Sequence, residues 1–368
     1  MRFPEFSGEW KMCTIGELTT KVGSGVTPRG GEAVYKTEGH PFVRSQNVGL
    51  GNLLLDDIAF IDEETHLRQK STELQFNDVL LNITGASIGR SALVDKQIVG
   101  GNVNQHVCII RTKENLVPSF ICSFLLSNYG QRQIDSFQAG GNRQGLNFEQ
   151  IKSIKITIPS KDEQIKIAKL LRAIDERIAT QNKIIDKLQS LIKGSAQNVA
   201  RNNKPNIRLS ECLECSSSTL QESDVCKNGT YPVYGANGIV GYLDNYNTEK
   251  EAVYIIKDGS GVGTVSYVTG KCSATGTLNT LQAKEGYSLQ YLYYMLKVFN
   301  FEPYKTGMAI PHIYFKDYGK AKIFCPSYTE QLKYARLLSA IDNKLSAEQS
   351  ILTDLSLQKQ YLLRQMFI

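Results

Sequence analysis

The residues of this chain that could take part in chemistry are mostly hydrogen-bonding side chains in short loops bounded by glycine. Arginine can donate two hydrogen bonds to a guanine, and asparagine or glutamine can pair with an adenine, in the major groove of DNA. Glycine lets the backbone come close to a ligand. We therefore expect base or phosphate contacts from seven residues of the first half: Arg44, Gln46, Asn47, Asn104, Gln105, Asn142 and Arg143.

Comparable loops recur in the second half of the chain. They contribute the candidate binding residues Asn237, Lys257, Lys305 and His312. Taken singly, each loop is more simply explained as a polar surface turn. Their recurrence at comparable places favours a shared binding role, and we expect them to contact nucleic acid as well.

Motifs for catalysis are missing from the sequence. Methyl transfer to a base amine uses an Asn/Asp-Pro-Pro-aromatic loop, and the chain contains no Pro-Pro pair. The glycine-rich segments 85–91 and 259–264 depart from the phosphate-binding pattern Gly-x4-Gly-Lys-Ser/Thr. Residues 9–11, Glu-Trp-Lys, lack a second acidic residue at a spacing suited to a nuclease. We expect no catalytic residue and no cofactor, and we expect both glycine segments to form turns at the same place in a repeat.

Metal ligands are also sparse. Cys212 and Cys215 form a single C-x2-C pair, whereas a structural zinc site needs four ligands. Completing the site with Cys226 and Cys272 would require an unusual spacing. The histidines show no zinc-binding pattern. We expect free thiols and no metal site, with zinc at Cys212 and Cys215 as the disfavoured alternative.

Composition indicates a cytoplasmic protein of two domains. A length of 368 residues suits two domains of about 150 residues each. No apolar run reaches the roughly 18–20 residues of a membrane span, and cysteines without a secretion signal suit a reducing compartment. Residues 159–205 hold 10 basic and 5 acidic side chains, whereas residues 1–158 hold 16 of each. A DNA contact in the globular parts must therefore use local clusters of charge.

One internal repeat organises the chain. Residues 159–175, PSKDEQIKIAKLLRAID, and residues 326–342, PSYTEQLKYARLLSAID, are identical at 11 of 17 positions without a gap, 167 residues apart. A fixed offset indicates a duplicated structural unit. Each copy opens with proline and serine before acidic or polar residues, which is typical of a helix start.

Apolar residues then recur with the 3-4 spacing of a coiled-coil seam. In the first copy they are Leu171, Ile174, Ile178, Ile185, Leu188 and Ile192, with Gln181 in the same register. In the second copy they are Leu338, Ile341, Leu345, Leu352 and Leu355, with Glu348 at the matching place. We predict that the two helices pair as an antiparallel coiled coil; the alternative is that each docks on its own globular domain. The first helix is expected to loosen at Gly194 and Ser195 and to lead into a polar linker at 201–205.

The remaining segments predict a mixed α+β fold in each half. Apolar, β-branched runs at 78–83, 107–110 and 252–256 indicate strands, and residues 118–133 and 288–299 carry helical spacing. The predicted fold class is α+β, with two duplicated domains and two long helices related by pseudo-twofold symmetry. The expected parts are globular domains at 1–158 and 206–325, a central helical region with linker at 159–205, and a distal helical region at 326–368.

With these motifs the sequence resembles the specificity subunits of type I restriction–modification systems. The resemblance rests on the repeated helix start, on Trp10-Lys11, and on the segments 23–28, 42–48 and 85–89. It implies two target-recognition domains, each reading one half of a bipartite double-stranded DNA site. It also implies that methylation and cleavage belong to partner subunits, namely methyltransferase subunits, expected to number two, and restriction subunits. The second half lacks a counterpart of the Trp10 opening, so its edge near 206–216 is less well defined.

Two other classes of function remain open from the sequence. One is a DNA methyltransferase or nuclease with a non-standard catalytic site, which the missing motifs disfavour. The other is a coiled-coil scaffold protein, which the large, loop-rich domains disfavour. The recognised DNA sequence and its spacer do not follow from the residues, because DNA shape adds specificity at positions that no side chain touches.

Overall fold

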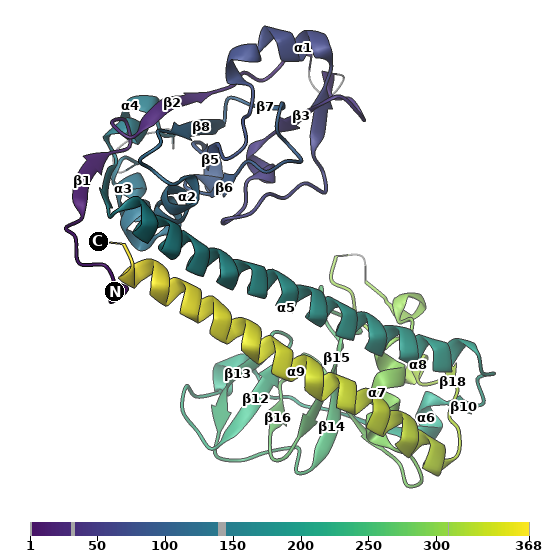
Figure 1. Ribbon diagram of the computed structural model, residues 1–368. Helices are drawn as coiled ribbons and strands as arrows, with labels where there is room; N and C mark the ends of the chain where they lie inside the picture. The colour runs from purple at the N-terminus through teal and green to yellow at the C-terminus, as the bar shows by residue number, and fades with distance from the viewer. Residues whose placement is uncertain (1, 31–33, 139–144, 308, 368) are drawn as a thin grey trace. The chain divides into compact units, whose positions relative to one another are not determined.

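The computed structural model describes residues 2–30, 34–138, 145–307 and 309–367 (Figure 1). The candidate residues Asn142 and Arg143 lie outside the described residues. The chain divides into two compact units: unit 1 holds residues 1–181 and 351–368, and unit 2 holds residues 182–350. Both divisions fall inside the two long helices, residues 161–201 and 328–365. Each unit therefore contains a globular part and one segment of each helix.

The strands of unit 1 form three sheets, with the orders β2-β8-β5-β6, β4-β3-β7 and β1-β9. Pairing is antiparallel except between β3 and β7, which run parallel. The elements of the globular part are β1 (Lys11–Thr14), β2 (Thr19–Ser24), β3 (His40–Val43), β4 (Ala59–Ile61), α1 (Glu63–Arg68), β5 (Val79–Asn82), β6 (Ser91–Leu93), β7 (Asn102–Val103), β8 (Val107–Thr112), α2 (Pro118–Leu126), α3 (Asn128–Ser136), α4 (Phe148–Ser153) and β9 (Lys155–Ile158).

The central strand β5 is apolar at three consecutive residues, 79–81, because both of its faces are covered. Side chains alternate between the two faces of a strand. Val79 and Leu81 join a core cluster that includes Phe120 of α2, whereas Leu80 joins a second cluster with Val43. This two-sided burial explains the apolar residues 79–81 within the segment 78–83 that is predicted to be a strand.

Unit 2 repeats the connectivity of unit 1 strand for strand. Its sheets have the orders β11-β17-β14-β15, β13-β12-β16 and β10-β18, and β12 and β16 form the parallel pair. The prediction of two duplicated mixed α/β domains is confirmed. The elements are β10 (Ile207–Arg208), α6 (Leu209–Cys212), β11 (Leu213–Ser217), β12 (Tyr231–Gly235), β13 (Gly238–Leu243), β14 (Glu251–Ile256), β15 (Val265–Thr269), β16 (Ser273–Ala274), β17 (Leu278–Ala283), α7 (Leu289–Lys297), α8 (Phe315–Tyr318) and β18 (Lys322–Ile323).

The repeated residues at the helix starts make repeated contacts. Gln164 is buried, its Nε2 donates to the carbonyl of Pro159 at 3.0 Å, and its Oε1 accepts from the amide of Val117 at 2.9 Å. Val117 is the N-cap residue of α2. Gln331 makes the corresponding bonds, at 2.9 Å each, with the proline before α9 and with the N-cap residue of α7. One glutamine therefore fastens the start of each long helix to a short helix of its own domain.

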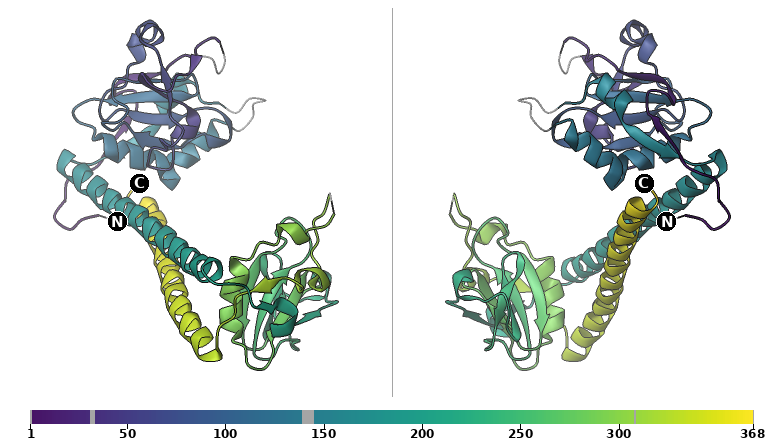
Figure 2. Two further views of the ribbon diagram at one scale, coloured as in Figure 1. Left: turned by 90° about the vertical axis from the view of Figure 1, so that its right-hand side faces the viewer. Right: turned by 90° about the vertical axis from the view of Figure 1, so that its left-hand side faces the viewer.

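The two long helices are α5 (Lys161–Arg201), of 41 residues, and α9 (Tyr328–Gln365), of 38 residues. In unit 1 the first turns of α5 lie beside the last turns of α9 and run in the opposite direction (Figures 1 and 2). The ammonium of Lys359 lies 2.5 Å from the Asp175 carboxylate. Leu362 and Met366 enter the same core cluster as Leu171, together with residues of the globular part. In unit 1, helix pairing and docking on the domain therefore occur together.

The seam predicted from the 3-4 spacing is buried or half-buried along both helices. The polar residues in its register, Gln181 and Glu348, are each only 6% exposed. In unit 2, Ile192 of α5 and Leu345 of α9 are both buried and line the same cavity. The heptad pattern thus identifies which face of each helix is covered.

The expected loosening of the first helix at Gly194 and Ser195 is wrong. α5 continues without interruption to Arg201. Ala196 and Val199 are 1% and 8% exposed, so packing continues past the glycine. A glycine inside a helix costs only about 1 kcal/mol relative to alanine, which such burial offsets. The linker is correspondingly short and begins at residue 202.

Two short α-helices of unit 1 are not duplicated among the described residues of unit 2, where only the α-helices α7 and α8 lie between β17 and β18, in place of α2, α3 and α4 between β8 and β9. α1 lies between β4 and β5, and the described residues between β13 and β14 contain no helix. The spacing of the strands along the chain therefore differs between the halves. Among the described helices, none has the length and hydrophobicity needed to cross a membrane.

Candidate nucleic-acid interface

Four segments distant in the sequence meet where the strands of unit 1 end. The amide of Asn104 donates to the last residue of β3 at 3.0 Å, and the amide of Ile83 donates to the carbonyl of His106 at 3.0 Å. Thr84 forms an isolated bridge with Gly145. We call the segments joined in this way, residues 44–47, 84–90, 104–106 and 145–147, the loop face of unit 1.

The first segment of this face is organised around Asp57. Nη2 of Arg44 donates to the Asp57 carbonyl at 2.8 Å and lies 3.7 Å from the Asp57 carboxylate. Nε2 of Gln46 donates to the same carboxylate. The Arg44 side chain is 26% exposed and Gln46 is exposed. One surface acid therefore holds both predicted donors in place.

Asn47 has a structural part in this segment. It is fully buried, its Oδ1 accepts from the Arg44 amide at 2.9 Å, and its Nδ2 donates to Leu54 and Asp57 at 2.9 Å each. A carboxamide used in this way has no free edge for a base. We therefore assign Asn47 to holding Arg44 and Gln46, and not to the contact surface itself.

Asn104 and Gln105 lie on the turn between β7 and β8 and differ in exposure. Asn104 is 7% exposed, and its Oδ1 accepts from the amide of His106 at 3.0 Å. Gln105 is exposed, with its Nε2 3.4 Å from Nε2 of His106. Nδ1 of His106 in turn lies 2.6 Å from the hydroxyl of Thr84. Gln105 is thus the accessible side chain of this turn, and Asn104 supports it.

Sequence reasoning misses Arg90, because it weighs residues 85–91 only as a phosphate-binding loop. Gly85 and Gly89 have φ angles of +73° and +84°, and the amide of Gly89 donates to the carbonyl of Asn82 at 3.0 Å. The segment is therefore a tight turn between β5 and β6. Arg90 follows the second glycine and is exposed. A basic residue directly after a glycine-bounded turn is the signal that would identify it.

The same framework recurs in unit 2. The amide of Thr275 donates to the carbonyl of Tyr234 at 2.9 Å, and the amide of Lys257 donates to the carbonyl of Thr277 at 3.1 Å. An isolated bridge joins Asp258 to His312. These bonds match, one for one, those that define the loop face of unit 1. We call residues 235–238, 258–264, 275–277 and 312–314 the loop face of unit 2.

The two glycine turns coincide, as the sequence predicts. Gly259 and Gly263 have φ angles of +96° and +91°, like Gly85 and Gly89 in unit 1. The amide of Gly263 donates to the carbonyl of Ile256 at 2.9 Å, which repeats the bond of Gly89. L-residues rarely adopt such φ angles, so glycine is required at these four positions.

The predicted residues of the second half differ in their settings. Asn237 is exposed at the tip of the β12–β13 hairpin. Nδ1 of His312 lies 2.6 Å from the Asp258 carboxylate, and the carbonyl of Lys257 accepts from the residue after His312 at 3.0 Å. Nζ of Lys305 donates to Glu302 at 2.6 Å. Lys257, like Lys305 and His312, is partly exposed, whereas Asn237 is exposed.

A polar cavity lies against the loop face of unit 2. It has a volume of about 650 Å³ and is lined by hydroxyl, amide and carboxyl groups of residues 218–223, Asp258 and residues 275–277. Sequence reasoning misses it, although the run of serine and threonine at 216–219 marks one wall. Glu222 and Asp258 supply acceptors, which suit amino groups such as N4 of cytosine.

The cysteines are free thiols, and most are buried. Burial raises the pKa of Cys212 to about 12 and that of Cys215 to about 11, so both are protonated near neutral pH. Within the part of the chain that the structure describes, no three histidine, cysteine, aspartate or glutamate side chains gather in a way that could hold a metal ion.

Two copies of one domain, each with a loop face and a segment of paired long helices, define a known class of protein. The sequence matches the family described as type I restriction modification DNA specificity domain over residues 7–190 and 205–356. These two stretches span most of the chain and follow its two copies. The chain therefore belongs to this family, and the resemblance predicted from the repeated helix start is confirmed.

Individual relatives agree with this assignment. A type I specificity subunit of Mycoplasma genitalium is 25% identical over 320 residues, covering 79% of this chain and 81% of the relative. The EcoKI specificity subunit of Escherichia coli is 23% identical over 202 residues, 52% of this chain and 41% of that protein. The crystal structure of the type I restriction–modification S subunit from M. genitalium has the same fold, with a TM-score of 0.68, 18% identity, and coverage of 100% and 99% of the two chains.

Membership of this family decides between the three functional classes considered from the sequence. The chain is a DNA specificity subunit of a type I restriction–modification system, and it is not the catalytic subunit. The enzyme and scaffold alternatives are not favoured.

Proposed function

We propose that each globular domain reads one half of a bipartite double-stranded DNA site through its loop face. Recognition domain 1 would comprise residues 1–158 and recognition domain 2 residues 206–325. The DNA specificity role follows from the family, and the duplication of the fold supports its division into two half-sites.

One observation carries the proposal: the two loop faces share a backbone framework and differ in their side chains. Gln46 in unit 1 corresponds to Asn237 in unit 2, and Thr84 corresponds to Asp258. Major-groove readout depends on the pattern of donors and acceptors. A constant framework with different side chains is therefore suited to reading two different half-sites.

The exposed and partly exposed candidates that lie in or beside each loop face are the proposed contacts, with the buried ones in support. In unit 1 the proposed contacts are Arg44, Gln46, Arg90 and Gln105, with Asn142 and Arg143 retained from the sequence and Asn47 and Asn104 as supports. In unit 2 they are the exposed Asn237 and the partly exposed Lys257, Lys305 and His312.

We further propose that α5 and α9 set the separation of the half-sites and dock methyltransferase subunits, two per chain, to which restriction subunits are added. Each long helix contributes residues to both compact units, which is what a spacer element requires. Apolar side chains are exposed on both helices: Ile184 and Leu191 are 37% and 51% exposed, and Leu357 and Tyr361 are 58% and 53% exposed. Exposed apolar residues in this number favour a protein partner.

A methyl-transfer assay tests the division of labour. The purified chain is incubated with labelled S-adenosylmethionine and genomic DNA, alone and with its methyltransferase subunit. Methyl transfer is expected only in the second mixture, and its specificity should change when exposed residues of a loop face are replaced by alanine. Methyl transfer by the chain alone would contradict the proposal, and so would unchanged specificity in all the alanine variants.

A further inference from the structure

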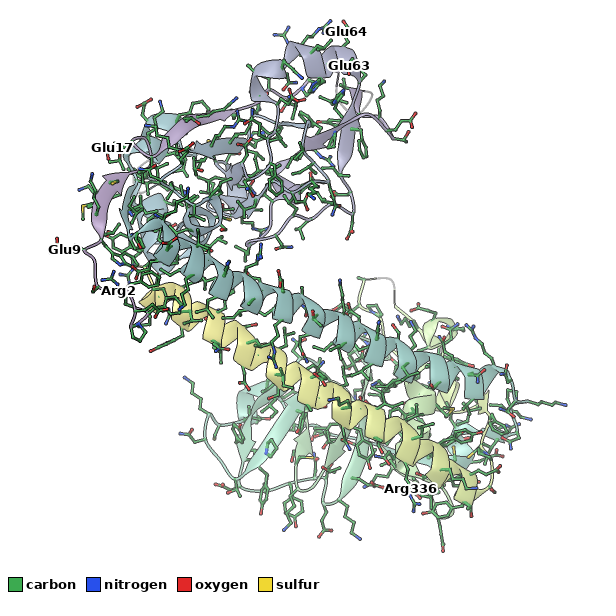
Figure 3. All side chains as sticks on the ribbon, viewed as in Figure 1. Arg2, Glu9, Glu17, Glu63, Glu64 and Arg336 are labelled. Atoms are coloured by element: carbon green, nitrogen blue, oxygen red, sulfur yellow. The ribbon has the colours of Figure 1, made fainter. Side chains whose placement is uncertain are left out.

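The first turns of α5 and α9 carry the same residues in different surroundings. Glu163 and Lys166 of α5 correspond to Glu330 and Lys333 of α9, 167 residues later. In unit 1 the Glu163 side chain is fully buried, and its two oxygens accept from Nε and Nη2 of Arg2 at 2.8 Å each. Figure 3 labels Arg2 near the N-terminus of the chain, where the first turns of α5 and the last turns of α9 lie close together.

Arg2 belongs to a short N-terminal arm, residues 2–6, that covers this helix start. The amide of Phe6 donates to the carbonyl of Phe3 at 3.2 Å, so the arm is folded into a turn. The ammonium of Lys166 lies 4.6 Å from the ring centroid of Phe3 and 6.0 Å from that of Phe6. Lys166 also pairs with Glu5. The helix start thus binds an arginine, an acid and two aromatic rings.

In unit 2 the same face of the helix start is exposed. Glu330 is exposed, and its carboxylate accepts from the hydroxyl of Ser327 at 2.8 Å. Leu337 is 58% exposed, whereas its counterpart Leu170 is partly buried against the core of unit 1. Glu330, Lys333 and Leu337 are spaced by three and four residues, so they share one face of α9.

The chain that leads into the second domain is directed elsewhere. Only residues 202–206 lie between α5 and β10. The carboxamide of Asn206 exchanges two hydrogen bonds with the backbone of Cys325, at 2.7 and 2.8 Å. Ile207 pairs with Ile323 as Cys13 pairs with Ile156, so residues 202–206 correspond to residues 8–12 and not to the arm at 2–6.

We propose that Glu330, Lys333 and Leu337 form a docking site for a segment of a partner chain that carries an arginine followed by aromatic residues, with the chemistry of residues 2–6. The site keeps the carboxylate and the ammonium that bind the arm in unit 1. A bidentate arginine–carboxylate pair is a strong, directional contact, and a lysine over aromatic rings adds to it. The arm of a second copy is not free for this role, because it is bound to its own Glu163.

The test uses the full chain and a synthetic peptide with the sequence of residues 1–10, labelled with a fluorophore at its C-terminus. We expect saturable binding at one site. Glu330→Gln should weaken binding at least tenfold, and so should replacing the peptide arginine by alanine. Asp354→Asn, which removes an exposed carboxylate elsewhere on α9, should leave binding unchanged.

Four results, the last from a crosslinking experiment, would overturn the proposal. The first is no saturable binding at millimolar peptide. The second is equal binding to the wild-type chain and to Glu330→Gln, or equal binding of the arginine and alanine peptides. The third is concentration-dependent dimerisation of the chain that Glu330→Gln abolishes, because it would assign the site to a second copy.

A peptide with a photoreactive group in place of its first phenylalanine should crosslink to residues 330–337, and adducts confined to unit 1 would also contradict the proposal. None of these readouts involves DNA, so the outcome is independent of the proposed half-site recognition.

Discussion

Gln46 and Asn237 occupy equivalent positions in the two halves of the chain, although they are separated by 191 residues and not by the 167 of the helix repeat. Each lies three residues after the strand residue, Val43 or Tyr234, whose carbonyl accepts an amide hydrogen bond from the turn that precedes β8 or β17. Both side chains are exposed carboxamides. This equivalence makes the two residues a matched pair for testing whether the halves read DNA independently.

Gln46→Ala should relax base preference in one half-site only, and Asn237→Ala should relax it in the other. Loss of a good side-chain contact to a base costs about 1–3 kcal/mol of discrimination. The measurement is binding or methylation of a DNA library randomised in both half-sites, using the chain assembled with its methyltransferase subunits. Gln360→Ala, at an exposed position of α9, is the control. Relaxation of the same half-site by both variants would contradict independent reading.

Gln164→Met and Gln331→Met should loosen different units. Each change leaves a buried backbone amide and a carbonyl without their side-chain partner, at a cost of about 1–3 kcal/mol. Hydrogen exchange measured by mass spectrometry should show faster exchange of α2 in the first variant and of α7 in the second. The exposed change Gln360→Met should alter neither. Equal effects of Gln164→Met on both short helices would show that this glutamine does not act within its own domain.

Lengthening both long helices by one heptad should lengthen the spacer of the recognised site. Seven residues are inserted after Ala179 and seven after Ser350, which preserves the seam. At about 1.5 Å per residue the helices gain roughly 10 Å, or about three base pairs of B-DNA. The preferred spacer is read from a library of spacer lengths.

The control for this experiment follows from the observed end of α5. Insertion of four residues between 202 and 205 lengthens the linker and leaves both helices intact. It should leave the spacer unchanged. If the heptad variant also keeps the original spacer while remaining active, the helices are docking surfaces and do not measure distance.

Thiol labelling should follow exposure. Burial raises the pKa of Cys108 to about 12 and that of Cys122 to about 11, so thiolate is scarce there at pH 8, whereas Cys226 is exposed. Because the thiolate is the reactive form, Cys226 should be alkylated first and the buried pair only after unfolding. Raising the pH should accelerate labelling. Mass spectrometry gives the order in which the cysteines are labelled. The experiment is repeated after treatment with a metal chelator, and a change in the labelling rate of Cys212 and Cys215 would support the disfavoured zinc site.

The parts predicted well from the sequence are those where local pattern and packing agree. The Pro-Ser start and Gln164 recur in α9 with the same bonds, so an ungapped comparison finds them. The 3-4 spacing identifies the buried seam because a long helix presents its residues in a fixed order. The glycine turns at 85–89 and 259–263 can be found from the sequence because few residues other than glycine adopt positive φ angles.

The parts missed depend on contacts that no local pattern contains. Asn47 looks like a free donor until Leu54 and Asp57 are brought against it. The pairing of Gln46 with Asn237 is hidden because the offset between the halves changes along the chain, from 191 there to 174 at Thr84 and Asp258. The offset changes because unit 1 contains insertions, such as α1, between the equivalent strands. Gly194 predicts a helix end locally, and the buried Ala196 and Val199 override it.

The central claim is that the two domains are separate readers of one bipartite site. The most direct measurement is sequencing of DNA modification in cells that express the complete system, with residues 1–158 either native or replaced by the same region of a relative with a different target. The native system is expected to modify a site made of two half-sites and a spacer. The chimera is expected to change one half-site while the other half-site and the spacer stay as they were. A chimera that alters both half-sites, or a native site without two separate parts, would contradict it.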